Sequence, residues 1–538
     1  MQRWNGWGDQ SVSVEVAPQT LAYLQSILGE STAPQEDTFE EVCSAVPESR
    51  LPEHRLVGKA PEGRLRHSRG QSLPDLIALR SGQGLLFPDG VAFPSSTAEV
   101  EELISYAREH DVSLIPYGGG TSVVGHVNPP PGERPVLTVD LRNLDRLVDL
   151  DHRSRLATFG AGVRGADLEA SLRARGYTLG HYPQSFEYST LGGWVATRSS
   201  GQQSLGYGRI EDLFVGGRLV TPSGSLHLKS HPASAAGPDL KHLVLGSEGR
   251  FGILTEATVR VSPLPEAEGF YGIFFPDWES AVEAARELVQ AGTSLSMVRV
   301  SDPRETETNL ALSFGPRKIA ALEFLLNARA IREGKCLAII GVSGTRRKTR
   351  LARREALRVT SRHGGVNVGS FPGRGWARSR FRAPYLRDAL WETGYAADTL
   401  ETATRWSNVN KTHEAIQHAL RPALEDEAES VHVFSHLSHL YKSGSSIYTT
   451  FVYRSGGDPA VALDRWRRLK KAASEAIIAS GATISHHHGV GSYHAPYMHT
   501  EKGELGVRAL EAALETLDEP GVMNPAALLD MLDTEEVN

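Results

Sequence analysis

"PYGGGTS" (residues 116–122) follows a short apolar run, Val112 to Ile115, which predicts a buried strand. Three successive glycines leave their backbone N–H groups uncovered and permit positive φ. Such a turn can cradle a pyrophosphate, with the hydroxyls of Thr121 and Ser122 as further donors. The segment is neither GxGxxG nor the GxxxxGK[ST] phosphate loop. Taken alone, a structural turn explains it equally well.

Two more glycine-rich segments repeat this pattern. "STLGGWVATRSSG" (189–201) joins hydroxyl side chains to paired glycines, and "GSEGRFGILTEAT" (246–258) leads into a strand-like run. Three such turns in one region indicate a single extended ligand with a phosphate-bearing spine.

The composition is that of a globular protein with more than one lobe. The chain has 538 residues, 40% of them hydrophobic and 22% charged, and this length exceeds that of one typical domain. The net charge of −7 argues against nucleic-acid binding, which requires a basic field. Only two cysteines occur, Cys43 and Cys336, which excludes a disulfide framework and favours a reducing compartment.

The sequence also bears on location. No apolar run reaches the roughly 18 residues that a membrane-spanning helix needs. The first ten residues lack the apolar core of a secretory signal, so we expect a cytoplasmic protein. Two basic stretches, residues 345–358 and 373–382, permit peripheral contact with a membrane, although a solvated helix face and a loop explain them more simply.

The pattern of elements divides the chain into four parts. We expect an N-terminal extension over residues 1–84, followed by a glycine-rich region of mixed strands and helices over 85–265. After residue 265, strand-like runs alternate with longer helical patterns, which predicts a second, α+β lobe over 266–480. Residues 481–538 are expected to return to the first lobe. The first region contains a predicted hairpin that turns at Pro222–Gly224.

"SHHHGVG" (485–491) places three histidines in a row. On a strand, adjacent side chains point to opposite faces, so that only His486 and His488 could ligate one ion together. No fitting set of Cys, His or Asp residues accompanies them in the sequence. We therefore expect no metal site.

The order of these segments carries a family resemblance. From "WNGWG" (4–8) through "PYGGGTS", "GHYPQSFEYSTLGGWVATRSSG" (180–201) and "GSEGRFGILTEAT" to "SHHHGVG" and "MNPAALL" (523–529), the chain resembles the alkyldihydroxyacetonephosphate synthases. These are flavoproteins of the vanillyl-alcohol-oxidase type. The resemblance covers nearly the full length. It implies an α+β fold of two lobes, an FAD-binding domain over residues 85–265 and an α+β cap domain.

The resemblance implies FAD as the cofactor and assigns the residues that hold it. The glycine triplet and its neighbours would cradle the pyrophosphate, and the other segments would line or complete the flavin site. The residues are Pro116, Tyr117, Gly118, Gly119, Gly120, Thr121, Ser122, Gln184, Ser185, Phe186, Glu187, Tyr188, Ser189, Thr190, Thr197, Arg198, Ser199, Ser200, Glu248, Gly249, Arg250, Phe251, Gly252, Ile253 and Leu254.

The implied activity is that of an ether-lipid synthase. Such a transferase exchanges the acyl chain of an acyl-dihydroxyacetone phosphate for a long-chain fatty alcohol, without net oxidation. Tyr448 matches the family's acid/base tyrosine, and Arg387 matches a substrate-binding arginine, whose fork suits phosphate. From the residues alone, a core tyrosine and a structural ion pair explain them too. Further catalytic candidates are His181, Arg299, His486, His487 and His488.

Two other functions remain open. An FAD-dependent 2-hydroxyacid dehydrogenase, of the D-lactate or glycolate type, would share the glycine turn but usually carries a single histidine where this chain has three. A non-catalytic FAD-binding protein would not need Tyr448, Arg387 and the histidine run. The two alkyl chains require an apolar channel, for which the helical pattern at 319–331 is a candidate, although core packing explains it as well. We further expect a homodimer.

Overall fold

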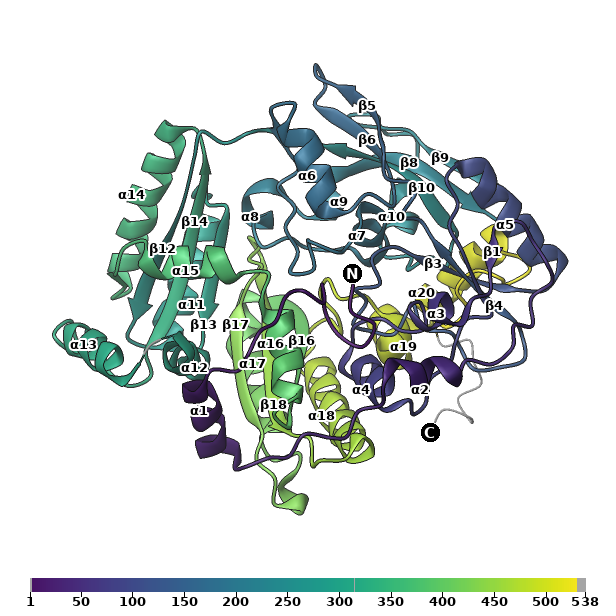
Figure 1. Cartoon of the computed structure of the whole chain (residues 1–538). Coiled ribbons are helices and arrows are strands. Elements are labelled where there is room, and N and C mark those ends of the chain that lie inside the picture. Colours follow the sequence, from purple (N-terminus) through teal and green to yellow (C-terminus); the bar gives the residue numbers. More distant parts are fainter. Residues whose placement is uncertain (1, 314, 530–538) are drawn as a thin grey trace.

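The computed structural model describes residues 2–313 and 315–529 and shows an α+β fold with two lobes (Figure 1). Within these residues, no helix is both long and apolar enough to cross a membrane. The predicted fold class is therefore confirmed, and the two lobes are built on separate sheets.

The first lobe rests on two sheets. The smaller has the strand order β1-β2-β4-β3, and the larger is antiparallel with the order β5-β6-β10-β8-β9. The strands are β1 (Val57–Gly58), β2 (Gly90–Ala92), β3 (Ser113–Tyr117), β4 (Val136–Asp140), β5 (Leu147–Asp151), β6 (Leu156–Gly160), β8 (Phe214–Thr221), β9 (Gly224–Leu228) and β10 (Ile253–Arg260), with a separate pair β7 (Tyr177–Thr178) and β11 (Ser262–Pro263).

Local signals set the elements that lead to the glycine turns. β3 is the predicted buried strand, with Leu114 and Ile115 fully buried, and the chain leaves it directly into the glycine triplet. The predicted hairpin is present as β8 and β9, which meet at Thr221 and Gly224. Helices of this lobe are α5 (Thr97–Glu109), α6 (Gly165–Arg173), α7 (Leu191–Thr197), α8 (Ser204–Tyr207), α9 (Ile210–Leu213) and α10 (Lys241–Val244).

The cap lobe is built on one antiparallel sheet of seven strands, in the order β15-β12-β14-β13-β17-β18-β16. The order is not that of the chain, so residues far apart in sequence become neighbours. The strands are β12 (Ala267–Phe275), β13 (Met297–Ser301), β14 (Cys336–Gly344), β15 (Val366–Asn367), β16 (Tyr395–Arg405), β17 (His432–Leu437) and β18 (Gly444–Arg454).

Four helices cover the outer face of this sheet, and two apolar clusters seal them against it: α11 (Trp278–Gln290), α14 (Arg346–Arg362), α17 (Val409–Leu420) and α18 (Pro459–Ala479). The strands alternate, so every second side chain points to the inner face, toward the first lobe. The other cap helices are α12 (Pro303–Ser313), α13 (Pro316–Asn327), α15 (Phe371–Ser379) and α16 (Ala383–Trp391).

The two ends of the chain tie the lobes together. In the N-terminal segment, α1 (Pro18–Leu28) packs on the cap, α4 (Leu73–Ser81) packs against α18, and β1 joins the first sheet. The segment expected to be an extension thus contributes to both lobes. After α20 (Met498–Leu517), Val522 and Asn524 hydrogen-bond to Leu114 of β3. The other helices are α2 (Phe39–Ser44), α3 (Pro61–Leu65) and α19 (Gly491–His494).

Candidate active site

A cavity of about 850 Å³ lies between the lobes. One wall is formed by the glycine-rich segments of the first lobe and the opposite wall by the inner face of the cap sheet. Its volume falls in the range of ligand pockets. The three glycine-rich segments therefore meet at one site, as their shared pattern predicted.

The glycine triplet forms a cradle of free N–H groups. Within the described chain, no backbone N–H of residues 118–122 donates a hydrogen bond, although all five residues line the cavity. The backbone passes so close to the neighbouring loop that a Cβ on Gly119 would lie 1.9 Å from the carbonyl oxygen of Tyr188. Buried donors need acceptors, and an anionic phosphate spine supplies them. The residues present therefore fit a pyrophosphate-bearing cofactor.

Most of the predicted cofactor residues line this cavity. Those that do are Pro116, Tyr117, Gly118, Gly119, Gly120, Thr121, Ser122, Gln184, Ser185, Ser189, Thr190, Thr197, Ser199, Ser200, Glu248, Gly249, Gly252 and Leu254. Seven others lie outside its lining: Phe186, Glu187, Tyr188, Arg198, Arg250, Phe251 and Ile253. Several of these support the wall: Arg198 pairs with Glu211, and Arg250 donates to the Met523 carbonyl.

Nine side chains of β16, β17 and β18 form three rows on the opposite wall, and β13 and β14 extend this wall with Arg299, Ser301, Leu337 and Ile339. β18 lies between β17 and β16, and the pairing register places one residue of each strand in every row. The first row is polar, and the other two carry more apolar and hydroxyl groups. The rows are His436–Tyr448–Glu401, Phe434–Thr450–Thr399 and His432–Val452–Ala397.

Tyr448 is the centre of the polar row. Its ring stacks on His436 with centroids 4.7 Å apart, and His488 meets it edge-on at 6.0 Å. Its hydroxyl faces Oε1 of Gln184, in the first lobe, at 3.5 Å. Burial raises the pKa of Tyr448 above its ordinary value. The phenol therefore holds its proton at physiological pH, and a nearby cation such as Arg299 is needed to favour the phenolate.

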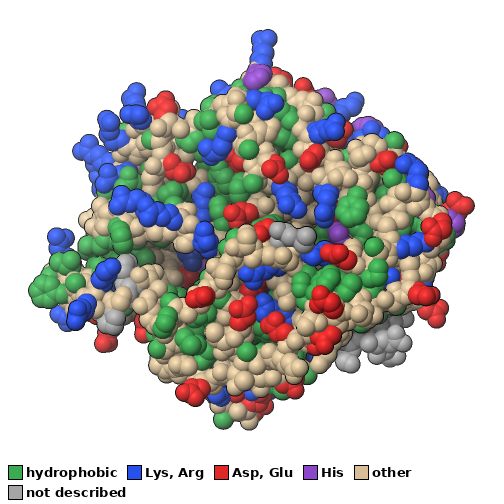
Figure 2. All heavy atoms as spheres, in the orientation of Figure 1, with side chains coloured by type: hydrophobic (Ala, Val, Ile, Leu, Met, Phe, Trp, Pro, Cys, Tyr) green, Lys and Arg blue, Asp and Glu red, His purple; other side chains and the backbone are tan. Residues whose placement is uncertain are grey.

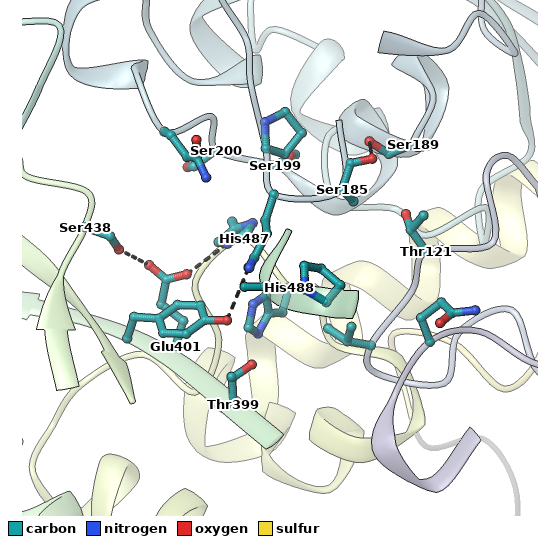
Figure 3. Close-up of a pocket in the computed structure, with 18 of the residues that line it drawn as sticks. Thr121, Ser185, Ser189, Ser199, Ser200, Thr399, Glu401, Ser438, His487 and His488 are labelled. Atoms are coloured by element: carbon teal, nitrogen blue, oxygen red, sulfur yellow. Dashed lines mark hydrogen bonds and ion pairs between the residues drawn. The ribbon is translucent and has the colours of Figure 1, made fainter. Parts of the chain in front are cut away.

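Glu401 gathers the histidine segment around one buried carboxylate. Its Oε2 lies 2.9 Å from Nε2 of His487 and its Oε1 lies 3.2 Å from Nδ1 of His486, while Ser438 donates a hydrogen bond to Oε1. Nearby imidazoles, His487 first, outweigh the effect of burial and hold the pKa of Glu401 well below its usual range. Figure 3 shows His487 and His488 beside Glu401, with Ser199 and Ser200 on the facing loop.

The histidine segment is not a strand. It bends through His487, whose φ is +53°, and Val490 and Gly491 donate backbone hydrogen bonds to Glu248. His487 and His488 line the cavity, whereas His486 lies behind it. The three histidines therefore do not share one environment.

The expectation of no metal site rested on a strand at the histidine run and on the lack of accompanying ligands, and both of these premises were wrong. The segment is bent, and a partner set does accompany it: Glu401, His439 and His487 offer ligand atoms within 4.8 Å of one another. Glu401 lies in β16 and His439 follows the end of β17, so only the folded sheet brings them near. The absence of a metal site stays a prediction, because the close contact of Glu401 with His487 also fits an ion pair.

The other predicted residues take different positions. Arg299 lines the cavity and donates to Oε1 of Glu305 at 2.7 Å. Burial tends to raise the pKa of Glu305, but Arg299 and His436 outweigh it and lower that pKa to about 2. Arg387 also lines the cavity, where it donates to the carbonyl oxygen of Gln71.

His181 lies outside the cavity lining, fully buried against Trp194. Its Nε2 is 3.2 Å from Oγ of Ser199, which does line the cavity. Burial lowers the pKa of His181 to about 3. His181 therefore lies behind Ser199 and supports the cavity wall as a neutral side chain.

The sequence reasoning missed several residues of the cap wall. They are Thr399, Glu401, His436, Ser438 and Arg380. No clear period marked them, since polar residues stand next to one another in "DTLET" (398–402) and at Ser435–His436, which breaks the alternation of a strand with one polar face.

Known proteins resemble this chain over its whole length. It is 33% identical to an alkyldihydroxyacetonephosphate synthase from Dictyostelium discoideum, over 99% of this chain and 94% of that protein. The chain belongs to the alkyldihydroxyacetonephosphate synthase family. A solved alkyldihydroxyacetonephosphate synthase superposes with a TM-score of 0.83 at 29% identity, covering 98% of this chain and 99% of that one.

Broader families match the two halves of this synthase family member. The FAD binding domain family matches residues 88–228, and the C-terminal domain family of FAD linked oxidases matches residues 264–528. A mitochondrial D-lactate dehydrogenase (cytochrome) from Arabidopsis thaliana is 25% identical over 82% of this chain and 73% of that protein. The cofactor is FAD, and the free N–H groups of residues 118–122 suit its pyrophosphate.

Proposed function

We propose that this flavoenzyme exchanges the acyl chain of an acyl-dihydroxyacetone phosphate for a long-chain fatty alcohol. The observation that carries the proposal is the three-row cap wall. It runs from a proton-handling row beside Gln184 to a far row in which Val452 and Ala397 join the apolar cluster of α1 and α16, next to His432. A substrate with a reactive polar head and an alkyl tail matches this gradient.

The far end of the wall suits alkyl chains. Val452 and Ala397 of the third row belong to one apolar cluster with Leu24 of α1 and Leu390 of α16, and all four line the cavity. Four residues of strand separate the first row from the third, or about 13 Å. An alkyl chain that extends along the rows is thus removed from water while its head stays at Tyr448.

The helix predicted as a channel candidate does not line the cavity. No described residue of α13 is part of the lining, and Phe324 and Leu325 of this helix are 76% and 64% exposed. The apolar end of the cavity is lined instead by strand side chains together with Leu24 of α1 and Leu390 of α16.

Each group in the polar row has a distinct task in the exchange. Tyr448 is the acid–base group: its phenolate, favoured by the nearby Arg299 cation, takes the proton from the carbon next to the substrate ketone, and the resulting phenol returns it. His436 and His488 hold its ring, and the contact with Gln184 fixes its hydroxyl at the flavin loop. FAD, when bound, supplies the reactive ring that the substrate head group faces.

Because the chain is also similar to a D-lactate dehydrogenase, the experiment has to distinguish ether formation from 2-hydroxyacid oxidation. A short 2-hydroxyacid would occupy only the first row and leave the apolar end at Val452 and Ala397 unused. The expected result for the purified flavoprotein is therefore formation of alkyl-dihydroxyacetone phosphate from acyl-dihydroxyacetone phosphate and hexadecanol, detected by mass spectrometry. Reduction of a dye by D-lactate, with no ether product, would assign the chain to the rival function.

We also propose that the protein works in the cytoplasm and touches a membrane to reach its lipid substrates. Figure 2 shows Lys and Arg side chains gathered over α14 and hydrophobic side chains at α13. Exposed Phe324 and Leu325 can enter the lipid interface while α14 meets anionic head groups. Flotation with anionic vesicles should retain the wild type and lose the variant that carries Phe324→Ser and Leu325→Ser. The homodimer stays a prediction.

A further inference from the structure

Three arginines are the cationic side chains among the described residues that line the cavity: Arg299, Arg380 and Arg387. The substrate of the proposed function carries a phosphate, and a buried phosphate requires a positive partner. Which arginine is free to serve depends on what each already contacts.

Two of the three are already occupied. Arg299 donates to Glu305, whose carboxylate neutralises it, and lies 3.1 Å from His436. Arg387 donates to the backbone carbonyl of Gln71 at 2.5 Å and to its side-chain oxygen at 3.3 Å. Asp388 lies 3.6 Å from the same guanidinium. The guanidinium of Arg299 thus has the carboxylate of Glu305 beside it, and that of Arg387 has the carboxylate of Asp388.

Arg380 is different. Among the residues that the structure describes, no carboxylate lies within ion-pair distance of its guanidinium, and its side chain donates no hydrogen bond. Its Nη1 atom is buried and has no partner. Burial lowers the pKa of Arg380, and the more distant carboxylate of Glu268 offsets this only in part, so the cation lies in a poorly solvated place with no contacting carboxylate.

Aromatic rings hold this guanidinium in place. Its central carbon lies 4.9 Å from the ring centre of Tyr182 in the first lobe, and 4.8 and 5.7 Å from those of Phe381 and Trp376 in the cap. Trp376 lies one helical turn before Arg380, at the end of α15, which brings the two side chains together. Stacking fixes the plane of the guanidinium and leaves its N–H edges free for an oxyanion.

We infer that Arg380 is the main anchor of the substrate phosphate, with Arg387 in a supporting position. The phosphate oxygens accept hydrogen bonds from the free N–H edge of Arg380. The phosphate thereby supplies the negative charge that no contacting carboxylate provides. This inference rests on the proposed function for the identity of the head group. It differs from the assignment by family resemblance, which gave that role to Arg387.

The test measures binding of dihydroxyacetone phosphate to the holoprotein by isothermal titration calorimetry. Loss of charged hydrogen bonds should weaken binding about 10- to 100-fold in Arg380→Gln, and Arg380→Lys should recover part of the loss. Arg378→Gln is the matched control, because Arg378 lies exposed on the same helix. Dihydroxyacetone, which lacks the phosphate, should bind wild type and Arg380→Gln alike. Flavin content, measured by absorbance, should be the same in every variant.

Three results would overturn the inference. They are unchanged binding of dihydroxyacetone phosphate to Arg380→Gln, an equal loss for dihydroxyacetone, and loss of FAD from the variant. The proposed function fails separately, and takes this inference with it, if the wild-type holoprotein neither binds dihydroxyacetone phosphate nor forms an ether product. Suppose that the wild type binds dihydroxyacetone phosphate and forms the ether product. Weaker binding of dihydroxyacetone phosphate to Arg387→Gln, with unchanged binding to Arg380→Gln, would then contradict this inference and leave the proposed function standing.

Discussion

The hydroxyl of Tyr448 lies 3.5 Å from Oε1 of Gln184, so that the centre of the cap wall meets the flavin loop across the boundary between the lobes. Tyr448 comes from β18 and Gln184 from the loop before α7. The proton-handling group and the cofactor site are thus positioned by two different sheets. Activity should therefore depend on this junction more than on either lobe alone.

Replacing Tyr448 by Phe should abolish ether formation while FAD stays bound. The change removes only the hydroxyl, and the ring can still stack on His436. Loss of a positioned acid–base group typically costs about 10²- to 10⁴-fold in rate. Product formation and flavin absorbance of the purified variant are the measurements. Normal turnover by Tyr448→Phe would remove Tyr448 from the mechanism.

Replacing Gly119 by Ala should strongly reduce the FAD content of the purified protein. The new Cβ would lie 1.9 Å from a backbone carbonyl oxygen of Tyr188, so the loop has to move and its free N–H groups lose their positions. Gly63→Ala is the control, because a Cβ there meets no atom within 4 Å. The ratio of flavin to protein absorbance gives the result. Full flavin content in Gly119→Ala would contradict the assigned cradle.

Replacing Val452 by Phe should change the preferred length of the alkyl chain. Val452 lies in the third row, 4% exposed, so a larger side chain shortens the apolar end of the cavity. We expect turnover with hexadecanol to fall about tenfold or more while turnover with decanol is largely kept. Val452→Ala should shift the preference the other way. A parallel loss for both alcohols would mean that the chain does not pass Val452.

Stability should fall as the pH drops from about 6.5 toward 4. Burial lowers the pKa of His126 to about 4 and that of His181 to about 3. In this window the unfolded chain binds protons that the folded protein excludes, so each histidine costs up to roughly 1.4 kcal/mol per pH unit. Thermal melts from pH 7.5 to 4.5 test this. His126→Gln should show a shallower dependence, and an unchanged slope would contradict the burial argument.

Local patterns were enough to predict much of the fold. The apolar run before the glycine triplet and the hairpin at Pro222–Gly224 were both readable, because turns and hydrophobic patterns act over a few residues. The glycine turns also indicated the cofactor site, since free N–H groups follow from the glycines themselves. β5 has the same length as β3 but was not predicted, because its side chains are mostly exposed and form no buried apolar run.

The cap wall could not be predicted in the same way. Glu401 meets His487 only because β16 is the edge of a sheet whose strand order differs from the order in the chain. The bend at His487 needs a left-handed residue that is not glycine, and no local signal marks it. That no carboxylate contacts Arg380 likewise follows only from the folded structure, because it depends on which distant residues surround the side chain. Long-range pairing, and not local propensity, decides these features.

The most direct test of the central claim is a stoichiometry. Purified holoprotein is given acyl-dihydroxyacetone phosphate and hexadecanol, and the released fatty acid, the alkyl-dihydroxyacetone phosphate and the consumed oxygen are counted together. We expect one fatty acid released for each ether formed, with no oxygen consumed and the flavin oxidised at the end. Two results would contradict the account. One is that oxygen or a dye is reduced in proportion to the substrate consumed, and the other is that fatty acid is released without any ether product.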